Sequence, residues 1–440
     1  MPEPHASRGL MPEILIKDAI VVTQDEGRKV VRGNVEVEDG RIAAVGRTKS
    51  DADEVIDARG GILIPGFVNA HTHVAMSIMK ALADDIPFDK FLERMFAADA
   101  DRKDTDILAG ARLGCLEMAR SGTTTFVDMY YSEDVIAKAV EETGLRGVLC
   151  WAVLDREYTT QKGVPLDNCK RFHSQFRSNP RVIPAIGLQG VYVCSKETFL
   201  DSKAFAEENG LLLHMHLSET RGEVYEHRKK HGKRPVEWLR DIGFLCEKVL
   251  AAHSAWLTIN EVRALARSRA SVATCPVSNM KLATGGVAPI PEMLREGVNV
   301  SIGTDGSSTN NSLDMFGEMK TLALLQKSNR WDATVVSAQQ ALDFATIGGA
   351  RAIGLEDQLG SIEAGKRADL VLLEAKAPNL VPVTKESAVS NVVYSANAGN
   401  VRTVLCDGKV IVRDRRSTLV SEDQVAESAS LAALDLLKGK

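Results

Sequence analysis

Hydrophobic and polar residues alternate in two different rhythms along the chain. Residues 12–60 contain short β-rich runs, among them Ile14–Ile16 and Val35–Val37, separated by Asp-Gly and Gly-Arg turns. This pattern is typical of antiparallel hairpins. Similar runs occur near the other end, at Ala368–Leu373 and Val401–Val412. Neither set has enough strands to close a hydrophobic core, so we expect both ends to build one small β-sandwich domain.

The middle of the chain, from about 60 to 350, alternates apolar runs with segments of helical composition such as Asp89–Gly122, Glu133–Thr143 and Asn260–Arg269. The apolar runs are Gly61–Pro65, Thr123–Asp128, Gly147–Val153, Val182–Leu188, Leu211–Leu217, Val249–His253, Ser271–Pro276 and Val298–Asp305. Eight buried strands that alternate with helices predict an α/β fold, a closed (β/α)8 TIM-type barrel. Its active site is expected at the carboxyl ends of the strands.

These rhythms divide the chain into four parts. We expect a flexible extension at residues 1–10 and a β-sandwich domain from residues 11–60 plus 357–420. The barrel is expected at 61–356, and a C-terminal helical segment at 421–440.

Composition narrows the function classes. The net charge is −5 and no basic stripe is visible, so nucleic acid is not an expected partner. The seven cysteines are dispersed without a CxxC pair, which argues against a disulfide framework or a thiolate zinc site and favours a reducing cytoplasm. No apolar run approaches the roughly 20 residues that span a bilayer, so no membrane partner is expected. A homo-oligomer is left open.

Candidate metal ligands gather at the predicted strand ends. His71 and His73 follow the first apolar run, and the period of two along a strand points both imidazoles the same way. The fifth run supplies His214 and His216, with Glu219 three residues further on. Taken alone, each HxH pair is weak evidence, because two-ligand motifs arise by accident.

Two further residues lie at the ends of later strands. His253 ends the sixth run, and Asp305 ends the eighth between glycines. Alone, His253 reads as a buried core histidine and Asp305 as a helix N-cap. Together, two histidines from the first strand, one from the fifth and Asp305 form a nitrogen and oxygen ligand set for one divalent metal per chain. Zn²⁺ fits best, and the same donors also suit Fe²⁺ or Mn²⁺.

The order of these motifs, with Asp84–Pro87 and Ser278–Leu282, resembles the metal-dependent amidohydrolase superfamily. Within it the chain is similar to aminohydrolases related to 5'-methylthioadenosine/S-adenosylhomocysteine deaminase. The resemblance implies hydrolytic deamination of an amino-substituted N-heterocycle, most simply an adenosine-type nucleoside. It implies four metal ligands, His71, His73, His216 and Asp305. His214, which lacks the glutamate at the implied spacing, is then expected in a second layer.

The resemblance also implies catalytic roles for Glu219, His253 and Asp305. Glu219 would carry a proton from water to a ring nitrogen, and Asp305 would help to protonate the leaving amine. Both would therefore contact the substrate. His253 would donate a hydrogen bond to the new oxygen.

Three positions depart from the relatives' pattern and concern the substrate. Gln189 stands where the relatives have a histidine, and Trp151 where they have an arginine. We expect Gln189 to hydrogen-bond the substrate and Trp151 to stack on it. A ribose-binding glutamate has no clear equivalent, which leaves Asp99 or Asp101 as its replacement. Trp151 and Gln189 lack the positive charge of an arginine or a protonated histidine. This predicts a preference for neutral substrates over S-adenosylhomocysteine.

Two alternatives are kept open. The same site could remove a different leaving group or act on a different ring, such as a triazine, guanine, pterin or cytosine, and ammonia release separates these cases. A barrel that serves as a non-catalytic scaffold is an alternative from another class, but it requires loss of metal ligands, and none is lost here.

Overall fold

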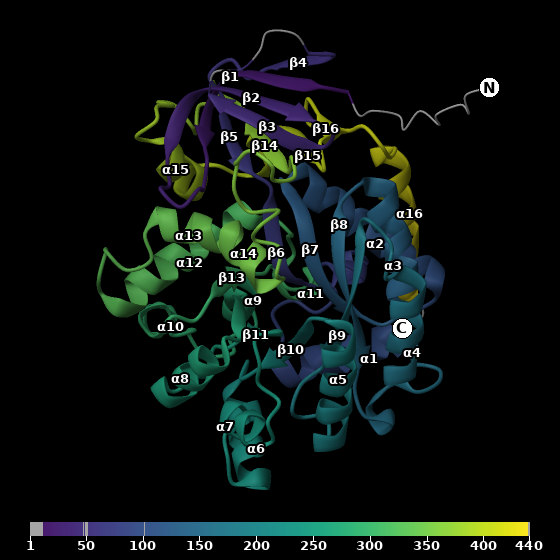
Figure 1. Cartoon of the computed structure of the whole chain (residues 1–440). Helices are drawn as coiled ribbons and strands as arrows, with labels where there is room; N and C mark the ends of the chain where they lie inside the picture. Colours follow the sequence, from purple (N-terminus) through teal and green to yellow (C-terminus); the bar gives the residue numbers. More distant parts are fainter. Residues whose placement is uncertain (1–11, 47, 49–51, 101, 439–440) are drawn as a thin grey trace, which may run out of the picture.

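The computed structural model describes residues 12–46, 48, 52–100 and 102–438, and the predicted extension 1–10 lies outside them (Figure 1). Two sheets organise the described chain. One lies at the top of Figure 1, and the barrel lies below it.

The upper sheet is mixed and combines strands from both ends of the chain, as the pattern of hairpins predicts. Its order is β17-β16-β15-β14-β5-β1-β2-β3, with β4 paired to β1. Its strands are β1 (Ile14–Val22), β2 (Val30–Glu38), β3 (Arg41–Gly46), β4 (Glu54–Asp57), β5 (Ile62–Pro65), β14 (Leu370–Leu373), β15 (Val401–Cys406), β16 (Lys409–Arg413) and β17 (Arg416–Ser417).

The second sheet has eight parallel strands in chain order, which confirms the (β/α)8 barrel. They are β6 (Phe67–Thr72), β7 (Thr123–Tyr130), β8 (Arg146–Val153), β9 (Val182–Leu188), β10 (Leu213–Leu217), β11 (Val249–His253), β12 (Ser271–Thr274) and β13 (Val300–Ile302). The first and last strands meet where the Asp305 N–H donates to the His71 carbonyl at 2.9 Å. A Cβ at Gly303 would lie 2.6 Å from the His71 Cβ, so glycine permits this close approach.

The first predicted barrel strand was placed wrongly. Gly61–Pro65 was expected to open the barrel, but β5 pairs with β1 and β14 of the upper sheet. The barrel begins after Gly66, at β6, which pairs with β7. The chain changes sheets at Gly66 because its N–H is bonded to Asp369 and a side chain there would collide with Thr124.

Helices surround the barrel (Figure 1). The helical segment predicted at Asp89–Gly122 is divided into α1 and α2, because Lys103 is extended and the Asp106 carboxylate accepts its N–H at 3.0 Å, starting a new helix. The helices are η1 (Val74–Met79), α1 (Phe88–Ala100), α2 (Asp104–Arg120), α3 (Glu133–Thr143), η2 (Arg156–Tyr158), α4 (Pro165–Phe176), α5 (Lys196–Asn209), α6 (Arg221–His231), α7 (Pro235–Asp241), α8 (Ile259–Ser268), α9 (Pro276–Lys281), α10 (Ile290–Glu296), α11 (Ser307–Asn310), α12 (Met315–Arg330), α13 (Ala338–Ala345), α14 (Ile347–Ala352), α15 (Ala388–Ser390), η3 (Asn391–Ser395), η4 (Ala398–Asn400) and α16 (Glu422–Lys438).

A buried ion cluster ties the barrel to the upper sheet. Arg146, at the amino end of β8, donates to Thr125 at 2.8 Å and to both carboxylate oxygens of Asp369 at 2.7 and 3.3 Å. Its guanidinium also pairs with Asp407, which Arg367 contacts at 2.7 Å. The nearby carboxylates outweigh the burial of Arg146 and raise its pKa. The cluster therefore holds a permanent charge between the two sheets.

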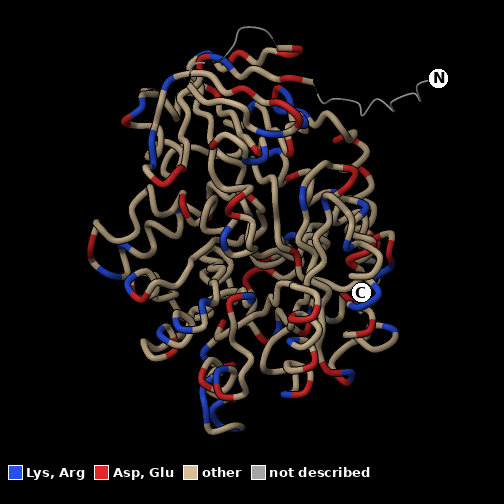
Figure 2. The backbone as a smooth tube through the Cα atoms, viewed as in Figure 1, with Lys and Arg blue, Asp and Glu red and all other residues tan. Residues whose placement is uncertain are grey.

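Charged residues of both signs are interspersed over the outer helices and loops (Figure 2). Basic residues gather in the last turn of α6. Among the residues that the structure describes, no helix is long and apolar enough to cross a membrane.

Candidate active site

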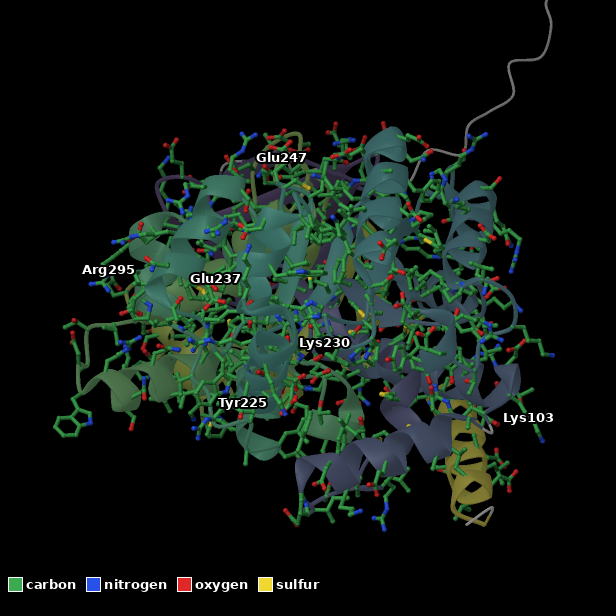
Figure 3. All side chains as sticks on the ribbon, turned by 90° about the horizontal axis from the view of Figure 1, so that it is seen from below. Lys103, Tyr225, Lys230, Glu237, Glu247 and Arg295 are labelled. Carbon is green, nitrogen blue, oxygen red and sulfur yellow. The ribbon has the colours of Figure 1, made fainter. Side chains whose placement is uncertain are left out.

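The candidate site lies at the end of the barrel that faces away from the upper sheet. The chain enters β6 from the upper sheet at Gly66, so the carboxyl ends of the parallel strands point in the opposite direction. Figure 3 looks onto this end, where Tyr225 and Lys230 of α6 are labelled. The predicted location at the carboxyl ends is therefore where the histidines meet.

Four predicted metal ligands come together there. The Nε2 atoms of His71 and His73 lie 3.5 and 3.3 Å from Oδ1 of Asp305. The Nε2 atom of His216 lies 3.2 Å from that of His73. These donors come from the end of β6 and the residue that follows it, from β10 and from the loop after β13.

Hydrogen bonds at the Nδ1 atoms indicate which nitrogen of each ring is free. The carbonyl of Met129 accepts from His73 at 2.6 Å, and that of Gln189 accepts from His216 at 2.8 Å. A carbonyl can only accept, so each Nδ1 carries the proton and, in the neutral ring, each Nε2 presents a lone pair. The two lone pairs face each other across the site.

A hydrogen bond to His214 also fixes which nitrogen of His71 carries the proton. The Leu250 carbonyl accepts from Nδ1 of His214 at 2.9 Å, so Nε2 of this neutral ring is an acceptor. His71 then donates to it through Nδ1 at 2.7 Å, and the lone pair on its own Nε2 points into the site. That Nε2 is buried and has no hydrogen-bond partner among the described residues. His214 therefore orients His71 from the layer behind it.

The electrostatics agree with neutral imidazoles beside an ionised acid. Burial lowers the pKa of His71 and His216 well below the usual value and that of His214 to about 3. Burial alone would raise the pKa of Asp305, but the nearby histidines, His71 above all, bring it well below its usual value. Converging lone pairs and one carboxylate are the donors that a divalent cation requires. The residues present therefore fit the metal that the sequence predicts.

A second set of potential donors shares His71. His71, His216 and His253 each offer a ligand atom within 4.8 Å of the others, as do His71, His73 and Asp305. Nδ1 of His253 contacts Oδ1 of Asn279 at 3.0 Å, and its Nε2 lies 3.8 Å from Oε2 of Glu219. Burial opposes protonation of His253, but Glu219 and Asp305 outweigh it and raise its pKa.

Glu219 stands at the open side of the cluster. Its side chain is 14% exposed, whereas that of His253 is 2% exposed. Burial among polar neighbours raises its pKa, which suits a carboxyl group that takes up and returns a proton. The structure therefore brings all three predicted catalytic residues to one place.

Two residues of α9 belong to the site but received no role from the sequence. The Ser278 hydroxyl donates to Oδ2 of Asp305 at 2.6 Å, and the next residue, Asn279, contacts His253. The signal was present as the motif Ser278–Leu282 after the seventh strand, but its side-chain directions depend on the start of α9 at Pro276.

The predicted substrate contacts fare differently. Gln189 adjoins the cluster through its carbonyl, and its side chain lies 3.4 Å from the Tyr192 hydroxyl. Trp151 does not adjoin it: the buried indole packs against Phe172 of α4 and donates to Gln161 at 2.9 Å. Alternate residues of β8 face the barrel interior, and Trp151 has the opposite parity, so its position does not support stacking on a substrate.

Asp99 is committed elsewhere as well. Its carboxylate pairs with the buried Arg102 at 3.2 Å and accepts from the Tyr130 hydroxyl. Asp101, the other candidate for ribose binding, lies outside the described residues.

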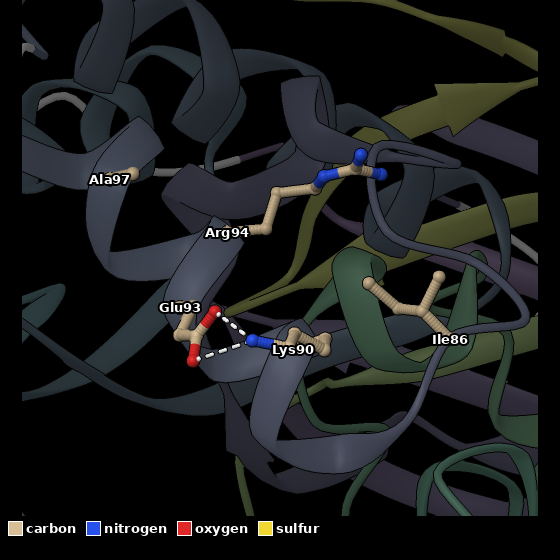
Figure 4. Close-up of a pocket in the computed structure, with 5 residues that line it drawn as sticks. All are labelled: Ile86, Lys90, Glu93, Arg94 and Ala97. Carbon is tan, nitrogen blue, oxygen red and sulfur yellow. Dashed lines mark hydrogen bonds and ion pairs between the residues drawn. The ribbon is translucent and has the colours of Figure 1, made fainter.

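A hollow of about 550 Å³ beside α1 is separate from the cluster (Figure 4). Its lining includes Lys90, whose ammonium lies 2.8 Å from the Glu93 carboxylate, and none of the predicted site residues. A second hollow of about 400 Å³ includes Tyr192, Lys230 and His231, next to the loop of Gln189.

Comparison with known proteins places this geometry in a family. Residues 62–411 match the amidohydrolase family. The 5'-deoxyadenosine deaminase of Methanothermobacter thermautotrophicus is 44% identical over 410 residues, 92% of this chain and 95% of that protein. The 5-methylthioadenosine/S-adenosylhomocysteine deaminase of Moorella thermoacetica is 42% identical over 426 residues, 95% of this chain and 98% of that protein.

A solved structure agrees. The crystal structure of an adenosine deaminase from Xanthomonas campestris with bound zinc superposes with a TM-score of 0.93 at 31% identity, over 97% of this chain and 98% of that one. The family match, the near full-length relatives and the histidine cluster at the barrel end lead to one conclusion: the chain belongs to the amidohydrolase family.

Proposed function

We propose that this enzyme hydrolytically deaminates an adenosine-type nucleoside and releases ammonia. The observation that carries the proposal is the convergence of three imidazole Nε2 atoms and the Asp305 carboxylate beside Glu219. The named relatives act on 5'-deoxyadenosine, 5-methylthioadenosine or S-adenosylhomocysteine, which supports this class of substrate.

We assign His71, His73, His216 and Asp305 as ligands of one divalent cation, and propose Zn²⁺ because the Xanthomonas relative binds it. When bound, such a cation supplies a water whose pKa is lowered from about 15.7 towards 7. His214, Ser278 and the carbonyls of Met129 and Gln189 hold these ligands in place.

The remaining steps belong to the protein's own carboxylates and His253. Glu219 takes the proton from water and gives it to the ring nitrogen next to the attacked carbon, which keeps negative charge from accumulating on the ring. Asp305 assists proton transfer to the amine that leaves as ammonia. His253, held by Asn279, donates a hydrogen bond to the new oxygen.

The substrate's tail is less constrained by the site. Arg146, one cation that could bind a carboxylate tail, lies at the opposite end of the barrel with Asp369. Gln189 is neutral and adjoins His216. The proposed preference for neutral nucleosides therefore rests on this residue alone. Trp151 no longer supports it, because it faces the helices.

The experiment is a panel of substrates with zinc-loaded protein, with ammonia release as the readout. Adenosine, 5'-deoxyadenosine, 5'-methylthioadenosine and S-adenosylhomocysteine are compared with guanine, cytosine, a pterin and chloro- and alkylamino-triazines. We expect ammonia from the adenosine-type nucleosides, with the neutral ones higher in kcat/KM. Faster turnover of a triazine, or of guanine, cytosine or the pterin, would overturn the proposal.

A further inference from the structure

Glu223 is a partly buried acid in the first turn of α6, the helix that follows β10. Its Oε1 accepts from the N–H of Ser218 and its Oε2 from the N–H of Glu219, both at 2.8 Å. These two peptides connect the end of β10 to α6. One carboxylate therefore holds the backbone that carries the Glu219 side chain.

The local backbone is shaped for this carboxylate. Ser218 has φ +49°, in the left-handed region that non-glycine residues rarely adopt. A residue in this conformation turns successive N–H groups to one side and forms an anion-binding concavity. The Thr220 hydroxyl oxygen accepts from the N–H of Glu223 at 3.0 Å, which fixes Glu223 in the same turn.

Partial burial of this acid has an energetic cost. Burial raises the pKa of Glu223 to about 7, against the hydrogen bonds from Glu219 and Ser218, which lower it. Within the described chain the carboxylate makes no salt bridge, so the two N–H groups are its main polar partners. A neutral capping side chain would satisfy the helix end more cheaply. The acid is therefore better explained by what it holds than by the stability of α6.

The segment that follows the neighbouring strand β11 holds the same peptides from the other side. The N–H of Trp256 donates to the Ser218 carbonyl at 2.9 Å, and that of Ser254 donates to the Leu217 carbonyl at 3.0 Å. By contrast, the Glu219 side chain has one ion-pair contact in the described structure, to His253 at 3.8 Å. Its direction thus depends on its backbone.

We propose that Glu223 is a positioning residue that fixes the peptide of Glu219, and so keeps the Glu219 carboxyl group where it can carry a proton between water and the substrate ring. Glu223 itself does not touch the substrate. This inference rests on the proposed function, because it requires Glu219 to be the proton carrier.

The test replaces Glu223 by Gln, which keeps the size but leaves one oxygen to accept and turns an amide N–H₂ towards a backbone N–H. We expect kcat to fall about 10- to 100-fold, with KM and zinc content unchanged. Glu223→Asp keeps the charge but is one methylene shorter, and we expect an intermediate loss of kcat. Glu223→Asp also serves if Glu223→Gln does not fold.

A double-mutant cycle separates positioning from a general structural role. In a Glu219→Gln background the carboxyl group to be positioned is gone, so adding Glu223→Gln should change kcat by less than about twofold. An equal loss in both backgrounds would overturn the inference. Full turnover of the Glu219→Gln single variant would show that Glu219 is not the proton carrier, which contradicts the proposed function. Full turnover of Glu223→Gln, with Glu219→Gln inactive, would contradict only the positioning role of Glu223.

Glu261 provides a matched control. It is a glutamate at the same position of α8, but its carboxylate accepts from the N–H of Thr258 at 2.9 Å and from Arg234 at 2.7 Å, and not from the peptides of Ser218 and Glu219. We expect Glu261→Gln to lower Tm and to leave kcat unchanged. A comparable fall in kcat for Glu261→Gln would show that loss of any such glutamate slows the enzyme, and would overturn the inference.

Discussion

Both ends of the barrel bury charged or ionisable side chains, but the two ends differ in how these side chains are paired. At the amino end, both terminal nitrogens of Arg146 are paired with carboxylates of the upper sheet. At the carboxyl end, Nε2 of His71 has no hydrogen-bond partner among the described residues, and the Nε2 atoms of His73 and His216 face each other at 3.2 Å. One cluster contains its own counter-charges, whereas the other directs imidazole lone pairs and one carboxylate to a common point.

This difference separates a structural cluster from a functional one. In the Arg146 cluster the charges are paired with each other, so removal of one partner would leave an uncompensated buried charge. A buried cluster that converges on a point with lone pairs left over needs a ligand there. The predictions that follow are ordered by their expected effect on turnover.

The largest effect is expected for His216→Ala. Loss of one of three imidazole donors should strip the metal. Loss of a general acid–base group typically lowers turnover by about 10²-fold, and we expect a larger fall here. Elemental analysis and ammonia release measure both. His227→Ala is the control. His227 of α6 is also buried, but its Nδ1 donates to the carbonyl of Lys233, which lies between α6 and α7 and outside the site. About one zinc per chain retained in His216→Ala would refute the ligand assignment.

Glu219→Gln should separate metal binding from chemistry. Gln cannot accept a proton from water, so kcat should fall by about 10² or more while zinc content stays unchanged. Steady-state kinetics with the best nucleoside, together with metal analysis, measure this. Near-normal turnover would remove Glu219 from the mechanism.

His214→Phe tests the layer behind the ligands. Phe fills the same space but cannot accept from His71, whose ring then loses the partner that fixes its tautomer. Metal affinity should fall about 10- to 100-fold, with turnover recovered at high zinc. A competition titration against a chelator measures the affinity. An unchanged affinity would show that His71 does not need this bond.

Arg146→Met tests the other end of the barrel. Removal of the guanidinium leaves Asp369 buried without its ion-pair partner. Such a change typically lowers the free energy of unfolding by roughly 3–5 kcal/mol. The midpoint of urea unfolding should therefore fall, while kcat per folded, zinc-loaded molecule should stay the same. A large loss of kcat with normal stability would mean that the two ends are not independent.

The sequence was sufficient for the features that depend on local periodicity. The apolar runs predicted the barrel, and the period of two predicted that the histidines of each HxH pair point into it. The sheet to which a strand belongs is harder to predict. β5 is as apolar as a barrel strand, and only its pairing with β1 and β14 assigns it to the upper sheet. Trp151 was misplaced because a shift of one residue reverses the face of a strand.

The layer behind the ligands could not be predicted in the same way. The roles of His214, Ser278 and Glu223 depend on hydrogen bonds between segments that are distant in sequence or joined by a left-handed turn. A motif shows that such residues are present, but not which atom they face. The bond from His214 to His71, for example, requires two strands to be in place.

The contact between Asp305 and the His71 carbonyl has a consequence for how the enzyme matures. It joins the first strand of the barrel to the loop that follows the last, and both residues are proposed metal ligands. A chain still emerging from the ribosome lacks Asp305 until nearly the whole barrel has been synthesised. Under the proposed ligand assignment, stable metal binding would therefore follow closure of the barrel, because a chain without Asp305 lacks one of the four ligands.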